Sequence, residues 1–178
     1  MYRSFRISSV IVLIVLTIFS CRSRQQILLD TVNSLIGKQL IFPQELIVFN
    51  DIDHLGKESL HDEGYKILIY LNPYTCSACK VKEMRLWDGP WKEFQEQGVP
   101  TIVLIDTDDM LEYKKEVDLQ KVKPLFVYDV AGQFMPLNKL PENPDFQSYL
   151  LKGETIVLVG NPYMNPRLFE LFLKEIEQ

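Results

Sequence analysis

The sequence predicts an α/β fold with a mixed central sheet, covered by helices on both faces in three layers. Short apolar runs at 66–71 and 99–106 alternate with helical segments, a pattern that indicates parallel strands joined by helices. Two further strand-like segments, 146–151 and 155–159, flank a short Gly-containing turn and predict an antiparallel hairpin. An amphipathic helix beginning at Asn165 or Pro166 completes the predicted order.

The segments before the first buried strand predict little regular structure apart from one helix. Apolar residues recur at helical spacing over 22–37, and Gly37 is a plausible end for that helix. Short apolar runs around Pro43 predict edge strands or extended chain over 41–50. The polar stretch 51–65 predicts a loop.

The middle of the chain predicts helices on either side of the second strand. Residues 76–87 have a helical pattern, which Asp88-Gly89-Pro90 should stop or bend before it resumes over 91–97. Asp108 or Asp109 can cap a helix that runs to Val117. Residues 125–130 then predict a third strand of the sheet.

The N-terminus has the pattern of a bacterial lipoprotein signal. Arg3 and Arg6 precede an apolar run over 7–19, and Ser20 stands directly before Cys21. The run is shorter than the about 20 apolar residues that a membrane span needs, which favours lipidation of Cys21 over an uncleaved anchor. Either way, we expect the rest of the chain to be exported and held at a bacterial membrane, with its domain facing the periplasm.

These features divide the chain into a signal peptide over 1–20, a membrane tether over 21–38 and one domain over 39–178. Cleavage before Cys21 would remove two of the 19 basic residues and none of the 24 acidic ones, so the net charge would change from −5 to −7. An acidic chain argues against nucleic acid as a partner, and against binding to a membrane through basic residues. Lipid on Cys21 would supply the attachment to the membrane.

The residues that carry chemistry are Cys76 and Cys79, which follow the first buried strand and open a helix. A helix N-terminus presents free N–H groups and a positive partial charge, so it stabilises a thiolate and lowers its pKa. Thiolates attack disulfides, and a second cysteine resolves the mixed disulfide. We expect Cys76 to be the exposed attacking residue and Cys79, one turn deeper, to resolve, with Lys80 and Lys82 adding positive charge nearby.

The strand, the sequence Cys76-Ser77-Ala78-Cys79-Lys80 and the trailing hairpin with its helix resemble the thioredoxin superfamily, in particular membrane-tethered periplasmic proteins of the TlpA/ResA type. The resemblance covers about residues 39–178. It implies a thioredoxin-like fold and dithiol–disulfide exchange with partner proteins. It implies no dissociable cofactor, and a redox partner protein must supply or remove electrons.

The sequence departs from the family pattern at several positions. Thr75 stands where family members often have Trp before the first cysteine, and Ser77-Ala78 replaces Gly-Pro. Tyr70 occupies the place of a buried acid, so the sequence does not support a carboxylate proton relay. The family also has a cis-proline opposite the dithiol. Alignment places Phe146 there, with Pro144 two residues earlier as the candidate.

Tyr74 and Thr75 flank the first cysteine, and we expect them, with Pro144, to contact the substrate. Two other functions stay open. One is a carrier that holds Cu(I) or zinc through the thiolates, with His54 and His61 as further ligand candidates. The other is a thioredoxin-like module that only binds proteins. An inert structural disulfide is less favoured, because so short a loop restrains the unfolded chain little.

Overall fold

The computed structural model describes residues 24–49, 56–74, 77–110, 113 and 124–178. The chain separates into two units, Met1–Ser34 and Leu35–Gln178. Helix α2 (Arg24–Leu35) confirms the helix predicted over 22–37, and the chain then turns through Gly37 at a φ of 80°. The predicted signal peptide and Cys21 lie outside the described residues. In the described ranges, no helix is both long enough and apolar enough to cross a membrane.

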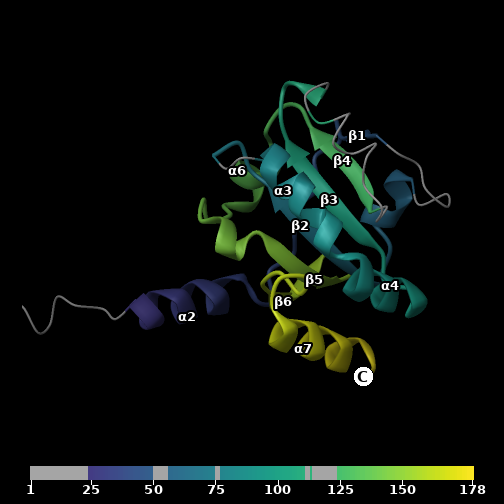
Figure 1. Cartoon of the computed structure of the whole chain (residues 1–178). Helices are drawn as coiled ribbons and strands as arrows, with labels where there is room; N and C mark the ends of the chain where they lie inside the picture. Colours follow the sequence, from purple (N-terminus) through teal and green to yellow (C-terminus); the bar gives the residue numbers. More distant parts are fainter. Residues whose placement is uncertain (1–23, 50–55, 75–76, 111–112, 114–123) are drawn as a thin grey trace, which may run out of the picture. The chain divides into compact units, whose positions relative to one another are not determined.

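The second unit is built on a six-stranded mixed sheet with the order β1-β4-β3-β2-β5-β6 (Figure 1). The strands are β1 (Ile47–Val48), β2 (Tyr65–Leu71), β3 (Thr101–Asp106), β4 (Leu125–Asp129), β5 (Ser148–Lys152) and β6 (Thr155–Val159). Strands β2, β3 and β4 are parallel, whereas β1, β5 and β6 each run antiparallel to the neighbour they join. The α/β class and the mixed sheet predicted from the sequence are therefore confirmed.

One face of the sheet packs against the helices α3 (Ser77–Glu83), α4 (Asp88–Glu96) and α7 (Pro166–Ile176). Alternate residues of β2, such as Ile67 and Ile69, form a buried core with Phe94 of α4 and Phe172 of α7. Asn165 caps α7, because its Oδ1 accepts hydrogen bonds from two N–H groups of the first turn. The predicted amphipathic helix after Asn165 is thus present where the sequence placed it.

The opposite face of β2 packs against the short helix α6 (Phe134–Asn138), which the sequence did not predict. The Phe134 ring lies 5.3 Å from the ring of Tyr70 and 5.4 Å from that of Phe42, measured between ring centroids. Five residues with a proline among them are too few to show a helical period. Helices therefore cover both faces of the sheet, as the three-layer prediction required.

Two local predictions differ from the structure. Asp88-Gly89-Pro90 does not interrupt a helix but forms the first turn of α4, where a proline needs no N–H partner. The break comes earlier, in the 3-10 turn η2 (Met84–Leu86) that follows α3. Of the described residues 41–49, only Ile47 and Val48 form a strand, β1.

Residues 37–40 lie along the outer edge of β6. The N–H groups of Gly37 and Leu40 donate to the carbonyls of Ile156 and Glu154, both at 2.8 Å, and Ile156 donates back to Lys38 at 2.9 Å. A further 3-10 turn, η1 (Lys57–Leu60), precedes β2, and another, η3 (Pro144–Phe146), precedes β5. The segment 37–40 thus covers part of an edge strand that would otherwise expose unpaired backbone groups.

Candidate functional site

The carboxyl end of β2 leads directly into the predicted dithiol. Cys79 lies in the first turn of α3, is exposed, and is disulfide-bonded. Tyr74, three residues after the end of β2, is 68% exposed. Cys76 and Thr75, the other residues predicted for this site on the same loop, lie outside the described residues. The described part therefore shows an exposed half-cystine on the first turn of a helix that follows the central strand.

Cys79 is more open to solvent than expected for a resolving cysteine that lies deeper than the attacking one. The reason is its position on α3. Val81, in that helix, and Met84, which follows it, are fully buried against the sheet. At 3.6 residues per turn, Cys79 points to the side nearly opposite to both of them. Lys82 on the same helix is also exposed, whereas the side chain of Lys80 lies outside the described residues.

The loop before the dithiol is fixed by a buried amide. Asn72 follows β2 directly and is fully buried. Its Nδ2 donates to the carbonyl of Glu142 at 2.9 Å, and its Oδ1 accepts from the N–H of Tyr74 at 3.1 Å. Asn72 therefore fixes the chain after β2 as far as Tyr74. The sequence analysis missed this role, and the only signal available was a polar residue placed between an apolar strand and a proline.

A second buried amide holds the loop that carries Pro144. The side chain of Gln147 donates from Nε2 to the backbone carbonyls of Pro141 and Glu142, each at 3.2 Å. The backbone carbonyl of Gln147 accepts from the N–H of Tyr70 at 2.8 Å. Pro144 is exposed and begins η3. No peptide bond within the described segments is cis, so the expectation of a cis-proline at Pro144 is wrong. Contact of Pro144 with a substrate stays a prediction.

A groove of about 340 Å³ lies beside these segments. Its walls are formed by Glu83 and Trp87, which follow Cys79 in the chain, by the loop 144–148, and by the segment 160–168, which leads into α7. Gly160 is needed in this wall, because its φ of 127° is unfavourable for other residues and a Cβ atom would meet Leu168 Cδ1 at 2.5 Å. Glu83, four residues after Cys79, is the lining residue of the groove that lies closest to Cys79 in the sequence.

The Trp87 ring forms part of the groove and is itself held in place. It stacks on Tyr163, with ring centroids 4.6 Å apart and an interplanar angle of 12°. The Tyr163 hydroxyl shares a hydrogen bond with the hydroxyl of Thr101, and burial raises the pKa of Tyr163. Trp87 is 3% exposed, and its Nε1 has no hydrogen-bond partner among the described residues.

Tyr70 stands where the thioredoxin pattern has a buried acid on β2. An acid from the neighbouring strand β3, Asp106, lies beside it instead. The Tyr70 hydroxyl donates to Asp106 Oδ2 at 2.7 Å. Asp129 is paired with Asp106 in the β3–β4 register and is fully buried; its Oδ2 accepts from the N–H of Phe134 at 2.6 Å, while its Oδ1 has no partner among the described residues. The sequence analysis missed this cluster, because Tyr70 and Asp106 come together only through strand pairing.

The ionisation of this cluster follows from its burial. Burial raises the pKa of Asp106, the Tyr70 hydrogen bond opposes that shift, and the nearby Asp129 and Asp108 carboxylates add to it. Burial, followed by the hydrogen bond to Asp106, raises the pKa of Tyr70. Asp106 also lines a hollow of about 450 Å³ together with Pro73 of the dithiol loop. A carboxyl group with a raised pKa thus lies at the carboxyl end of the parallel strands, the end at which β2 leads toward Cys79.

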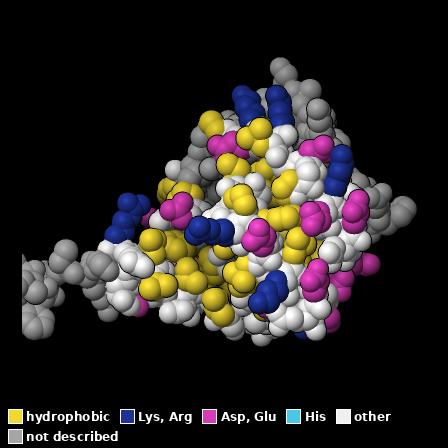
Figure 2. Space-filling model, turned by 60° about the horizontal axis from the view of Figure 1, so that its bottom comes forward, with side chains coloured by type: hydrophobic (Ala, Val, Ile, Leu, Met, Phe, Trp, Pro, Cys, Tyr) yellow, Lys and Arg dark blue, Asp and Glu magenta, His cyan; other side chains and the backbone are white. Residues whose placement is uncertain are grey.

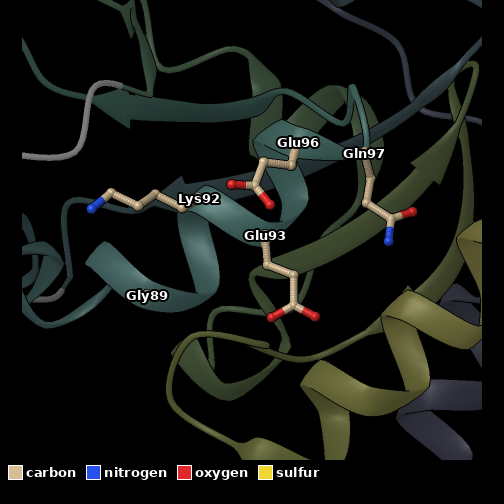
Figure 3. Close-up of a pocket in the computed structure, with 5 residues that line it drawn as sticks. All are labelled: Gly89, Lys92, Glu93, Glu96 and Gln97. Carbon is tan, nitrogen blue, oxygen red and sulfur yellow. The ribbon is translucent and has the colours of Figure 1, made fainter.

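A larger hollow of about 610 Å³ lies elsewhere, on the outside of α4 (Figure 3). Its lining residues all come from α4 and the residue after it, and Figure 3 shows their side chains diverging rather than meeting. Lys92 instead pairs with Asp88 one turn earlier, with a distance of 3.2 Å between Nζ and Oδ2. The arrangement is that of a solvated helix surface, without converging groups.

The structure separates His61 from Cys79. His61 precedes β2 by four residues, and its Nδ1 lies 2.8 Å from Glu154 Oε1. Cys79 follows the other end of the strand, and seven strand residues span about 20 Å. His61 is therefore not a ligand of the same metal ion as Cys79, while His54 lies outside the described residues. No group of three or more metal-ligating side chains occurs within the described ranges.

Comparison with protein-family models and with curated proteins finds no match. Solved structures do match. The thioredoxin domain of a thiol-disulfide oxidoreductase from Bacteroides vulgatus aligns with a TM-score of 0.56 and 16% identity, over 79% of this chain and 97% of the other. A thiol:disulfide interchange protein from Bacteroides sp. aligns with a TM-score of 0.54 and 15% identity, over 81% and 93%.

A protein from Chlorobium tepidum assigned as the thiol:disulfide interchange protein DsbE aligns with a TM-score of 0.52 and 13% identity, over 79% of this chain and 94% of the other. Identities this low establish the fold and not the activity. The chain therefore has a thioredoxin-like fold.

Proposed function

We propose that the chain is a thiol–disulfide oxidoreductase that exchanges disulfides with partner proteins through Cys76 and Cys79. The observation that carries the proposal is Cys79, exposed and disulfide-bonded on the first turn of α3, at the end of the central strand of a thioredoxin-like fold. Cys76, three residues earlier, is the partner that the sequence spacing favours for this disulfide. The helix N-terminus would stabilise a thiolate at this place.

The exchange balances without a further cofactor. The Cys76 thiolate attacks one sulfur of a substrate disulfide, a mixed disulfide forms and one substrate thiolate leaves. The Cys79 thiolate then attacks the Cys76 sulfur, so that the second substrate thiol leaves and the Cys76–Cys79 disulfide forms. Two electrons have passed to the substrate, and a dithiol protein must return two electrons to this chain. The same steps run in reverse if the chain acts as an oxidant.

Serine substitutions test the proposal with a matched control inside the chain. We expect Cys76→Ser to abolish disulfide exchange and Cys79→Ser to accumulate a mixed disulfide, both measured with a protein disulfide and by mass spectrometry under non-reducing conditions. Cys21→Ser should leave exchange unchanged. Undiminished exchange in Cys76→Ser would rule the proposal out. Exchange lost equally in Cys21→Ser would point to a different cysteine pairing.

The reduction potential of the couple decides the direction. A value near about −270 mV would make the chain a reductant of other disulfides, whereas one near about −120 mV would make it an oxidant. Equilibration with dithiothreitol or glutathione, followed by alkylation of free thiols, measures this potential. If Cys76 and Cys79 form no disulfide at any ratio of oxidised to reduced dithiothreitol or glutathione, the exchange mechanism is excluded.

We also propose that the domain acts at the cell envelope, attached through lipid on Cys21 and facing the periplasm. The support is the pattern of the first 21 residues, with its basic start, short apolar run and Ser20-Cys21. We expect radiolabelled palmitate to be incorporated into the wild-type protein and not into Cys21→Ser. Equal labelling of the two proteins would show that Cys21 does not carry the lipid.

A further inference from the structure

Two loops at the carboxyl end of β2 share one hydrogen-bond acceptor. The backbone carbonyl of Glu142 accepts from Asn72 Nδ2 at 2.9 Å and from Gln147 Nε2 at 3.2 Å. Asn72 belongs to the loop that leads toward Cys79, and Gln147 belongs to the loop between α6 and β5. The Asn72 and Gln147 residues are buried, at 0% and 2% exposure. The Glu142 carbonyl therefore joins the two loops through buried side chains.

The loop that supplies this carbonyl is itself fixed by local hydrogen bonds. The N–H of Asp145 donates to Asn143 Oδ1 at 3.0 Å. The N–H of Gln147 donates to the carbonyl of Pro144 at 3.2 Å, and β5 begins at the next residue. The Glu142 carbonyl is therefore held in place by the loop that carries it, and it can serve as an anchor for the loop on the other side.

Asn72 uses both ends of its amide to hold that other loop. Its Nδ2 bonds to Glu142, and its Oδ1 accepts from the N–H of Tyr74 at 3.1 Å, in a turn of the kind that asparagine favours. Hydrogen bonds are stronger beneath the surface than in water, because the local dielectric constant is lower. The chain is thus anchored as far as Tyr74, which precedes Cys76 by two residues in the sequence.

We infer that Asn72 is a positioning residue, which favours the disulfide between Cys76 and Cys79 by anchoring the loop before Cys76 to the Glu142 carbonyl. A restrained chain raises the effective concentration of one thiol at the other. Release of the anchor gives the reduced form more conformational freedom than the oxidised form, whose loop the disulfide already closes. The equilibrium then moves toward the dithiol. This inference rests on the proposed disulfide exchange and adds a residue that sets its equilibrium without taking part in the transfer of electrons.

The test is the reduction potential of the Cys76–Cys79 couple in the full chain in detergent. The protein equilibrates with reduced and oxidised glutathione, and mass spectrometry after alkylation reads the state of both cysteines. Oxidised glutathione takes up the two electrons and two protons that the dithiol releases. We expect Asn72→Ala to lower the equilibrium constant for disulfide formation about tenfold, which raises the potential by about 30 mV for a two-electron couple.

Asn72→Ser separates the two hydrogen bonds of the amide. Its hydroxyl can still accept from the N–H of Tyr74, but it is too short to donate to the Glu142 carbonyl. We expect the potential of this variant to rise, as in Asn72→Ala. A wild-type potential in Asn72→Ser would overturn the inference alone, because the link to Glu142 would then have no effect on the dithiol. The serine variant also decides the question if Asn72→Ala does not fold.

Asn138→Ala is the matched control for the loss of a buried amide. Asn138 is 2% exposed and joins α6 to Ile41, with bonds of 2.8 Å to both the N–H and the carbonyl of that residue. Its replacement should lower the midpoint of urea unfolding about as much as Asn72→Ala does, and should leave the reduction potential unchanged. An equal shift of the potential in Asn138→Ala would overturn the inference alone, because the effect would then follow general stability.

A surface control comes from α7. Figure 2 shows hydrophobic side chains gathered over the face that carries this helix, and Leu171 of α7 is 45% exposed. Leu171→Ser should change neither the unfolding midpoint nor the potential by a measurable amount. If the wild type forms no disulfide between Cys76 and Cys79, the proposed function fails and this inference fails with it.

Discussion

Polar groups are buried at both ends of strand β2, but their hydrogen bonding and exposure differ between the two ends. At the amino end, Lys66 is 1% exposed, and its Nζ donates to the carbonyls of Leu60 and Asp62 at 2.8 and 2.6 Å. Burial lowers the pKa of Lys66, and Asp62, Glu154 and Glu63 oppose that shift. The ammonium group is thus surrounded by acceptors, and this end of the strand is closed.

At the carboxyl end, the polar groups are only partly satisfied and the surface is open. Asp129 Oδ1 has no partner among the described residues, Asp106 faces a hollow, and Cys79 is exposed. A buried polar group with all its partners stabilises the fold, whereas groups left reachable or incompletely paired are available for chemistry. The comparison predicts that substitutions at the amino end change stability alone.

Removing the buried ammonium should have the largest effect on stability. We expect Lys66→Met to lower the free energy of unfolding by about 2 kcal/mol, because two buried carbonyl oxygens lose their donor. Urea unfolding measures the change, and the rate of disulfide exchange by the folded protein should stay the same. Lys92→Met, on the surface of α4, serves as the control with a change below about 0.5 kcal/mol. A loss of exchange in folded Lys66→Met would break the distinction between the two ends.

Substitution of Asp106 should have a smaller effect on the free energy of unfolding, and that effect should depend on pH. Its raised pKa means that the folded protein holds the proton more tightly than the unfolded chain does. The resulting stabilisation is present below the ordinary carboxyl pKa and is lost as the pH rises through the raised value. Asn cannot ionise but still accepts the Tyr70 hydrogen bond. Asp106→Asn should therefore gain stability relative to the wild type between about pH 4 and pH 7.

Urea unfolding of both proteins at a series of pH values gives this difference. Tyr70→Phe removes the hydrogen-bond donor that opposes the upward pKa shift of Asp106, so this substitution should raise the pKa of Asp106 further. A stability difference between Asp106→Asn and the wild type that does not vary with pH would show that burial has not altered the ionisation of Asp106.

The smallest effect is expected for the pair of His61 and Glu154, which lies at the amino end but on the surface. The hydrogen bond from His61 lowers the pKa of Glu154. The stabilisation from a lowered carboxyl pKa is present above its ordinary value and is lost as the pH falls through the lowered one. Glu154→Gln should cost at most about 0.5 kcal/mol above pH 5, and less in high salt.

Thermal unfolding at pH 6 and at pH 3 checks this expectation, with the exposed Glu58→Gln as a control of equal charge change. A cost for Glu154→Gln that is larger at pH 3 than at pH 6 would contradict the assigned cause of the shift. A cost near that of Lys66→Met would show that this pair, rather than the buried ammonium, holds the amino end together.

Local patterns predicted the elements that depend on local signals. The apolar runs in β2 and β3 and the Asn165-Pro166 start of α7 are visible within a few residues. Helix α6 is too short for its period to be seen. The partners of Tyr70 and Asn72 lie 36 and 70 residues away, so only the completed sheet brings them together. The groove lined by Glu83 likewise joins four segments that no spacing in the sequence relates: the end of β2, residues 83–87, the loop 144–148 and the segment 160–168.

The hydrogen bonds between residues 37–40 and β6 have a mechanical consequence. A force that pulls on the chain before Gly37 is taken up first by these bonds, at the outer edge of the sheet. From there the load passes to β6 and β5, which are joined by an antiparallel ladder, and also to α6, because Lys38 and Ile41 hydrogen-bond to Asn138. The load therefore enters the domain through β6 and α6 rather than through the loop that precedes Cys79.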